Sequence, residues 1–76
     1  MGPNKSTNRG IRIIQGREVQ IVELGWASGH KAFEVILLGE EGEDLLTEGE
    51  FLLEMPTNGK LAQMISKHTA RKASLN

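Results

Sequence analysis

The stretch that decides the fold is residues 11–38, IRIIQGREVQIVELGWASGHKAFEVILL. It holds three runs rich in β-branched and other apolar residues, which are residues 11–14, 18–26 and 31–38. Runs of this kind, bounded by turn residues, are typical of β-strands. The Gln15-Gly16 pair fits a two-residue turn, so the first two runs predict a β-hairpin and the third run predicts a further strand.

The second run does not alternate cleanly between apolar and polar residues. Its apolar residues fall on both faces of a strand: Val19 and Ile21 on one, and Val22, Leu24 and Trp26 on the other. Either a β-bulge near Ile21 and Val22 or burial of both faces accounts for this pattern. The sequence leaves both explanations open.

After residue 38 the sequence predicts an acidic turn at residues 39–44 (GEEGED) and then a fourth strand at residues 50–55. Apolar residues alternate in that strand, and Pro56 disfavours a helical conformation at the residue before it. The fourth strand is therefore expected to end at Met55.

From Lys60 to about Lys72 the apolar period changes to that of a helix. The helical spacing i, i+3, i+4 and i+7 is followed by Leu61, Met64, Ile65 and His68. Thr57 or Asn58 is available as the N-cap. A competing interpretation is a β-hairpin over residues 50–65, because Asn58-Gly59 is a strong turn signal. We favour the helix.

Together these elements predict the α+β class, with a small antiparallel sheet of three to four strands and one C-terminal helix packed on it, in the order β-β-β-β-α. Residues 11–73 form the single domain. Residues 1–10 are polar and basic and predict a flexible arm, and residues 74–76 predict a disordered tail.

Length and composition exclude several classes. A chain of 76 residues without cysteine has room for one core, and it holds no disulfide framework, zinc ribbon or thiol nucleophile. The longest apolar run is residues 35–38, far shorter than a membrane span, and the N-terminus has no signal-peptide pattern. We therefore expect a cytoplasmic protein that does not interact with membranes.

Charge is segregated along the chain, although the net charge is −1. Residues 1–31 hold five bases and two acids, residues 32–59 hold eight acids and no base, and residues 60–76 hold four bases and no acid. This segregation predicts surfaces of opposite sign, which bears on partners more than on fold.

The acidic segment and the single tryptophan are the candidate protein-binding residues: Glu40, Glu41, Glu43, Asp44 and Trp26. A carboxylate-rich surface docks basic partners, and tryptophan is enriched at the centres of interfaces. We therefore expect a small non-enzymatic interaction or regulatory protein that binds a protein partner through this segment or through its sheet, as a monomer or homodimer.

The alternative is a small nucleic-acid-binding protein that uses the basic arm and one face of the helix. Its candidate residues are Lys5, Arg9, Arg12, Arg17, Lys60, Lys67 and Arg71. Bases on extensions and helix faces contact phosphates, although a net charge of −1 disfavours a polyanionic partner.

Enzymatic chemistry and cofactors are not expected. Ser28 and His30 place a hydroxyl near an imidazole, but nucleophilic catalysis also needs an orienting carboxylate and an oxyanion site. Two isolated histidines make a poor metal-ligand set, and no phosphate-binding glycine motif is present. The sequence assigns no catalytic residue and no metal or cofactor site.

Overall fold

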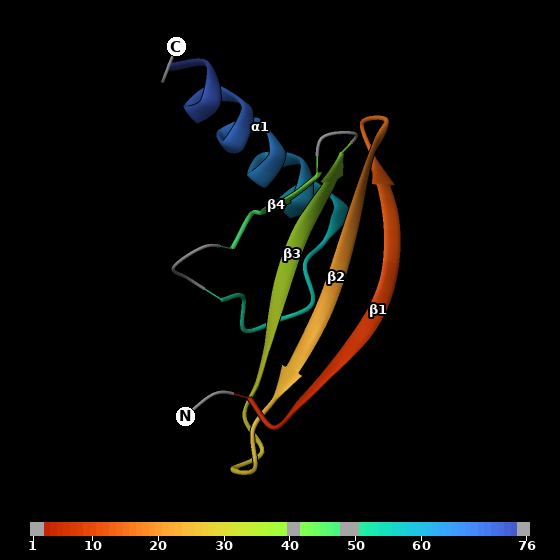
Figure 1. Ribbon diagram of the computed structural model, residues 1–76, viewed down its shortest axis with the longest axis vertical. Coiled ribbons are helices and arrows are strands. Elements are labelled where there is room, and N and C mark those ends of the chain that lie inside the picture. The colour runs from red at the N-terminus through yellow and green to blue at the C-terminus, as the bar shows by residue number, and fades with distance from the viewer. Residues whose placement is uncertain (1–2, 40–41, 48–50, 75–76) are drawn as a thin grey trace.

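The computed structural model describes residues 3–39, 42–47 and 51–74 as one four-stranded antiparallel sheet followed by one helix (Figure 1). The strands are β1 (Lys5–Ile14), β2 (Arg17–Gly25), β3 (Lys31–Gly39) and β4 (Gly42–Leu45), and they lie side by side in chain order. The helix α1 (Asn58–Ser74) packs on one face of this sheet. The expected α+β fold class and its β-β-β-β-α order are confirmed.

The β1–β2 connection is the tight turn that the sequence predicted. Gln15 and Gly16 both have positive φ, at 53° and 77°. Two consecutive residues of positive φ are what a type I′ hairpin turn requires, and this turn matches the right-handed twist of the strands. Glycine at the second position carries no steric penalty there, because it has no Cβ.

One irregularity interrupts the sheet, and it lies in β1. Asn8 pairs with Val22 and Ile11 pairs with Gln20, so two residues of β1 occupy the space opposite Ile21. The second of these two is Gly10, whose φ is 101°. The pairing of β2 with β3 runs without a shift. The irregular pattern in β2 therefore reflects burial on both of its faces, and the bulge belongs to its neighbour.

The expected flexible arm at residues 1–10 needs correction from Lys5 onward. Residues 5–8 pair with residues 22–25 and extend the first strand well beyond the predicted residues 11–14. The backbone N–H and C=O groups along the edge of β2 need hydrogen-bond partners, and the backbone of any residue can provide them. The polar residues 5–8 therefore pair with β2 although they carry no apolar pattern. Residues 75–76 of the expected tail lie outside the described residues.

The fourth strand also differs from the prediction, because it is β4 and not residues 50–55. Of that segment, the described part makes one isolated bridge, in which Leu52 and Phe33 exchange backbone hydrogen bonds of 2.8 and 3.1 Å. Between β4 and this bridge, the Val35 N–H donates to the Thr47 hydroxyl at 3.3 Å. β4 and the segment after it thus satisfy the outer edge of β3 in turn.

The helix begins where Thr57 accepts a hydrogen bond through its Oγ1 from the Lys60 N–H at 3.1 Å. This bond is the N-cap that the sequence offered, and it excludes the hairpin interpretation of residues 50–65. The core lies between α1 and the sheet. It consists of Ile14, Val19, Ile21, Phe33, Val35, Leu37, Leu61 and Ile65. The C-terminal end of the helix extends away from the sheet (Figure 1).

Replacement of Leu61 by Ala tests this packing. Leu61 is 0% exposed and is the helix residue most deeply buried against the sheet, so the change should lower the free energy of unfolding by about 2–5 kcal/mol. The matched control is Leu53→Ala, because Leu53 is 80% exposed, and its effect should stay within about 0.5 kcal/mol. Urea denaturation measures both. Equal effects of the two substitutions would contradict the described packing of α1.

Replacement of Gly16 by Ala tests the hairpin turn. A side chain at this positive φ should lower the free energy of unfolding by about 1–2 kcal/mol, even though nothing lies within 4 Å of the added Cβ. Gly25→Ala is the matched control, since Gly25 has equal space around it without positive φ. Urea denaturation should show a loss for Gly16→Ala only. A free energy of unfolding for Gly16→Ala equal to that of the wild type would contradict the assigned turn type.

Candidate functional site

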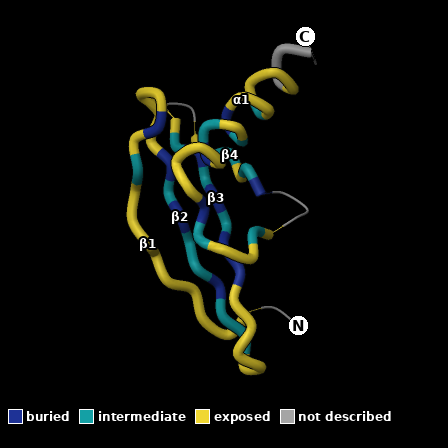
Figure 2. The backbone as a smooth tube through the Cα atoms, turned by 180° about the vertical axis from the view of Figure 1, so that it is seen from behind, coloured by how far each residue is buried: buried dark blue, intermediate teal, exposed yellow. Residues whose placement is uncertain are grey.

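Cross-strand pairing divides the sheet into two faces, which we call the helix face and the open face. Partners such as Val19 and Leu37, or Ile21 and Val35, are buried under α1 and define the helix face. The residues between them point the other way. Figure 2 shows this alternation of buried and partly buried positions along β2 and β3, whereas β1 is exposed over most of its length.

The open face carries a row of paired side chains that crosses all four strands and is apolar on β1, β3 and β4. This apolar row runs through Ile11, Gln20, Ile36 and Leu45, and the amide of Gln20 is its one polar member. Its two ends are the most accessible, since Ile11 is 53% and Leu45 is 43% exposed. Beside it, Ile13 on the same face is 65% exposed. The described part of the chain places no helix over these residues, so the side chains of Ile11, Ile13 and Leu45 face solvent.

Carboxylates border this apolar row on both sides. On one side Glu18 and Glu43 both pair with Leu38, and on the other side Glu34 pairs with Val22. The lysine and arginine residues that pair across strands lie on the helix face: Lys5, Arg12, Arg17 and Lys31. The open face of the described strands thus carries carboxylates and no paired base, whereas the helix face carries these bases together with Glu23 and Asp44.

Trp26 lies at the far end of the open face. It follows Leu24 by two positions, and its ring meets that of Phe51 edge to face, with centroids 6.3 Å apart. Leu24 and its partner Ala32 are buried on this face, next to the ring pair. Trp26 is itself partly buried, so the ring pair closes one end of the apolar surface.

The acidic candidate residues do not form one surface. Glu43 is exposed on the open face, but its neighbour Asp44 points to the helix side, where its Oδ2 lies 3.2 Å from Nε2 of His68. This contact attaches α1 to β4. His68 is partly buried, as fits its place in the helical period with Leu61, Met64 and Ile65. Glu40 and Glu41 lie outside the described residues.

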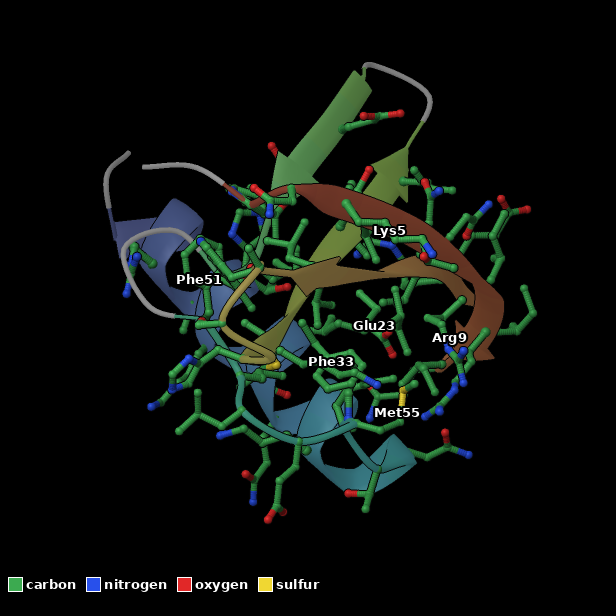
Figure 3. All side chains as sticks on the ribbon, turned by 90° about the horizontal axis from the view of Figure 1, so that it is seen from below. Lys5, Arg9, Glu23, Phe33, Phe51 and Met55 are labelled. Atoms are coloured by element: carbon green, nitrogen blue, oxygen red, sulfur yellow. The ribbon has the colours of Figure 1, made fainter. Side chains whose placement is uncertain are left out.

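The basic candidate residues are on the helix side of the sheet and along α1. In Figure 3 Lys5 and Arg9 lie on the same side as Glu23, Phe33 and Met55. Arg12 has a structural role, because its Nη1 donates to the Pro56 carbonyl at 2.7 Å and to Oδ1 of Asn58 at 3.3 Å. The remaining candidates are exposed at the start of β2 and along α1: Arg17, Lys60, Lys67 and Arg71.

The Ser28 hydroxyl and Nδ1 of His30 are 2.7 Å apart in the exposed β2–β3 loop. No hydrogen bond joins this pair to a carboxylate within the described loop. Among residues 3–39, 42–47 and 51–74, no group of three or more His, Asp or Glu side chains could hold a metal ion. The same residues include no helix that is long and apolar enough to cross a membrane.

Comparison with protein-family models, curated proteins and solved structures finds no match. Ile11, Ile13 and Leu45 were not predicted from the sequence as residues of the site. The sequence signal for the first two is the alternation of Ile11 and Ile13 with Arg12, which places the two isoleucines on one face and the arginine on the other.

Replacement of Arg12 by Gln separates the structural role of Arg12 from a role in ligand binding. The loss of its charged hydrogen bonds to the start of α1 should lower the free energy of unfolding by about 1 kcal/mol. Arg17→Gln is the control, because Arg17 is exposed on the next strand, and it should change stability by less than about 0.5 kcal/mol. Urea denaturation compares the two. Unchanged stability in Arg12→Gln would show that Arg12 does not anchor the helix.

Proposed function

We propose that this chain is a small non-enzymatic protein-binding domain and that its open face is the docking surface. The observation that carries the proposal is the apolar row that ends in Ile11 and Leu45, together with the exposed Ile13 beside it. Contiguous apolar surface of this kind on a small domain marks an interaction site.

The composition of the open face supports a protein as the partner. Interface centres are apolar and rich in aromatic residues, and their rims are polar. The open face has the same arrangement, with aliphatic side chains in the middle, the Trp26–Phe51 pair at one end and carboxylates along the sides. Of the residues first expected to bind a partner, Glu43 and Trp26 belong to this surface, whereas Asp44 is held by α1.

Nucleic-acid binding stays as the second candidate because the strand bases share the helix face. This surface is weaker support, since Arg12 is already bonded to the start of α1 and Glu23 lies among the bases. If that surface binds nucleic acid, replacing Lys60, Lys67 and Arg71 together by Gln should abolish the binding, and the affinity should fall steeply with added salt. The cytoplasmic location expected from the cysteine-free sequence remains a prediction.

Capture from a cell lysate tests the protein-binding proposal. The variant Ile11→Thr/Ile13→Thr removes apolar surface from the open face but keeps β-branched residues in β1. Proteins retained by immobilised wild-type chain should be reduced at least about tenfold by this variant, since each buried aliphatic side chain contributes about 1.5–3 kcal/mol. Quantitative mass spectrometry measures the retained proteins.

The matched control for this experiment is Leu53→Thr, which removes an exposed leucine outside the sheet. It should retain the same proteins as the wild type. Capture that is equal for the open-face variant and the wild type would contradict the proposal, as would the absence of any specifically retained protein.

A further inference from the structure

We propose that the partner element bound by the open face is an amphipathic helix whose apolar stripe is bordered by lysine and arginine. This inference rests on the proposed docking function and adds the chemistry of the partner. It is drawn from the arrangement of carboxylates around the apolar row and from the way α1 covers the other face of the same sheet.

The helix face shows how this sheet accommodates a helix. α1 buries Leu61 and Ile65, four residues apart on one side of the helix, in one core with residues of β1, β2 and β3. On the open face, β2 and β3 present Val22, Ile36 and Leu38, which are only partly buried. Four strands span about 14 Å, and a helix with its side chains is about 10 Å wide. One helix is therefore enough to cover the apolar row.

The carboxylates of the open face determine which side chains flank the apolar stripe of the bound helix. Rows of side chains on one sheet face lie about 7 Å apart, so Glu18 and Glu43 border the apolar row on one side and Glu34 borders it on the other. Among the described residues, none of these three carboxylates makes an ion pair within the chain. A helix lying on the apolar row places its flanking residues beside these carboxylates. Lysine or arginine at the flanking positions would form ion pairs with them.

The same carboxylates disfavour other occupants of the face. A second copy docked face to face brings Glu18, Glu34 and Glu43 of both copies into one interface, which costs free energy through like-charge repulsion. A nucleic acid brings phosphates to the same carboxylates. Pairing of two copies along β1 is opposed by the bulge at Gly10 and by the bases on that edge strand, features that block edge pairing.

Three synthetic peptides of about 18 residues, titrated into the isotope-labelled full chain, test the inference. The first has Leu at i, i+3, i+4 and i+7 and Lys at the flanking positions. The second replaces each Lys by Glu, and the third has the composition of the first in an order that gives no stripe. The first peptide should shift the methyl resonances of Ile11, Ile13, Ile36 and Leu45, with an affinity at least about tenfold above the other two.

Charge reversal on the protein supplies the second arm. Glu18→Lys/Glu43→Lys changes two exposed residues of the open face and should weaken the Lys peptide by about tenfold and strengthen the Glu peptide. Glu54→Lys is the matched control, because Glu54 is exposed and outside the sheet, and it should leave both affinities unchanged. The amide spectrum of each variant reports whether the fold is intact. The comparison of the three peptides on the wild type does not depend on these variants.

The contradicting outcomes are distinct. If the Glu peptide binds the open face as tightly as the Lys peptide, the charge argument is wrong while the docking function stands. If none of the peptides shifts open-face resonances, the inference about the partner is wrong, and the lysate capture decides the docking function separately. If open-face resonances change with protein concentration alone and sedimentation gives the mass of a dimer, the occupant is a second copy and the inference is overturned.

Discussion

The packing of Leu61 and Ile65 of α1 into one core with residues of β1, β2 and β3 is the interaction on which the rest of the structure depends. A sheet buries its apolar face by packing against another element, and here one helix on one face supplies that burial. The chain contains a single described helix and two sheet faces. Because this helix covers the helix face, the open face is left to solvent. The exposed open face, which we propose as the docking surface, follows from this arrangement.

The attachments of α1 strengthen this asymmetry. Arg12 holds the start of the helix through the Pro56 carbonyl, and the contact of His68 with Asp44 holds a later turn to β4. Both attachments use charged residues on the helix side of the sheet. The carboxylates of the open face have no such use in the described fold. Glu18, Glu34 and Glu43 are therefore the carboxylates that we propose contact a partner, whereas Asp44 already contacts His68.

Periodicity in the sequence was enough to predict β2, β3 and α1, because each carries an apolar pattern fixed by its contact with the core. It was not enough for residues 5–10 or for β4. These segments pair with the edges of β2 and β3 through backbone groups, and backbone pairing leaves no mark in a polar sequence. The prediction of a strand at residues 50–55 was wrong because, of the described residues 51–55, only Leu52 pairs with β3.

The candidate site was predicted in part. Its acidic residue Glu43 and its aromatic residue Trp26 were among the predicted binding residues, but the residues of the apolar row were not. The bulge at Gly10 shifts the register by one residue and changes which β2 residues lie opposite residues 5–8. Ile11 and Ile13 lie between this bulge and the turn, where their alternation with Arg12 places them on one face, but the sequence does not show which face α1 covers.

Paramagnetic relaxation of side-chain methyl groups by a neutral soluble gadolinium chelate tests the central claim most directly. The chelate relaxes methyl groups that solvent reaches, without binding to the protein. The account predicts fast relaxation for Ile11, Ile13 and Leu45 and slow relaxation for Val19, Ile21 and Leu61, which lie under the helix. Equal protection of both groups in the dilute chain would show that the open face is already covered, and it would contradict the account.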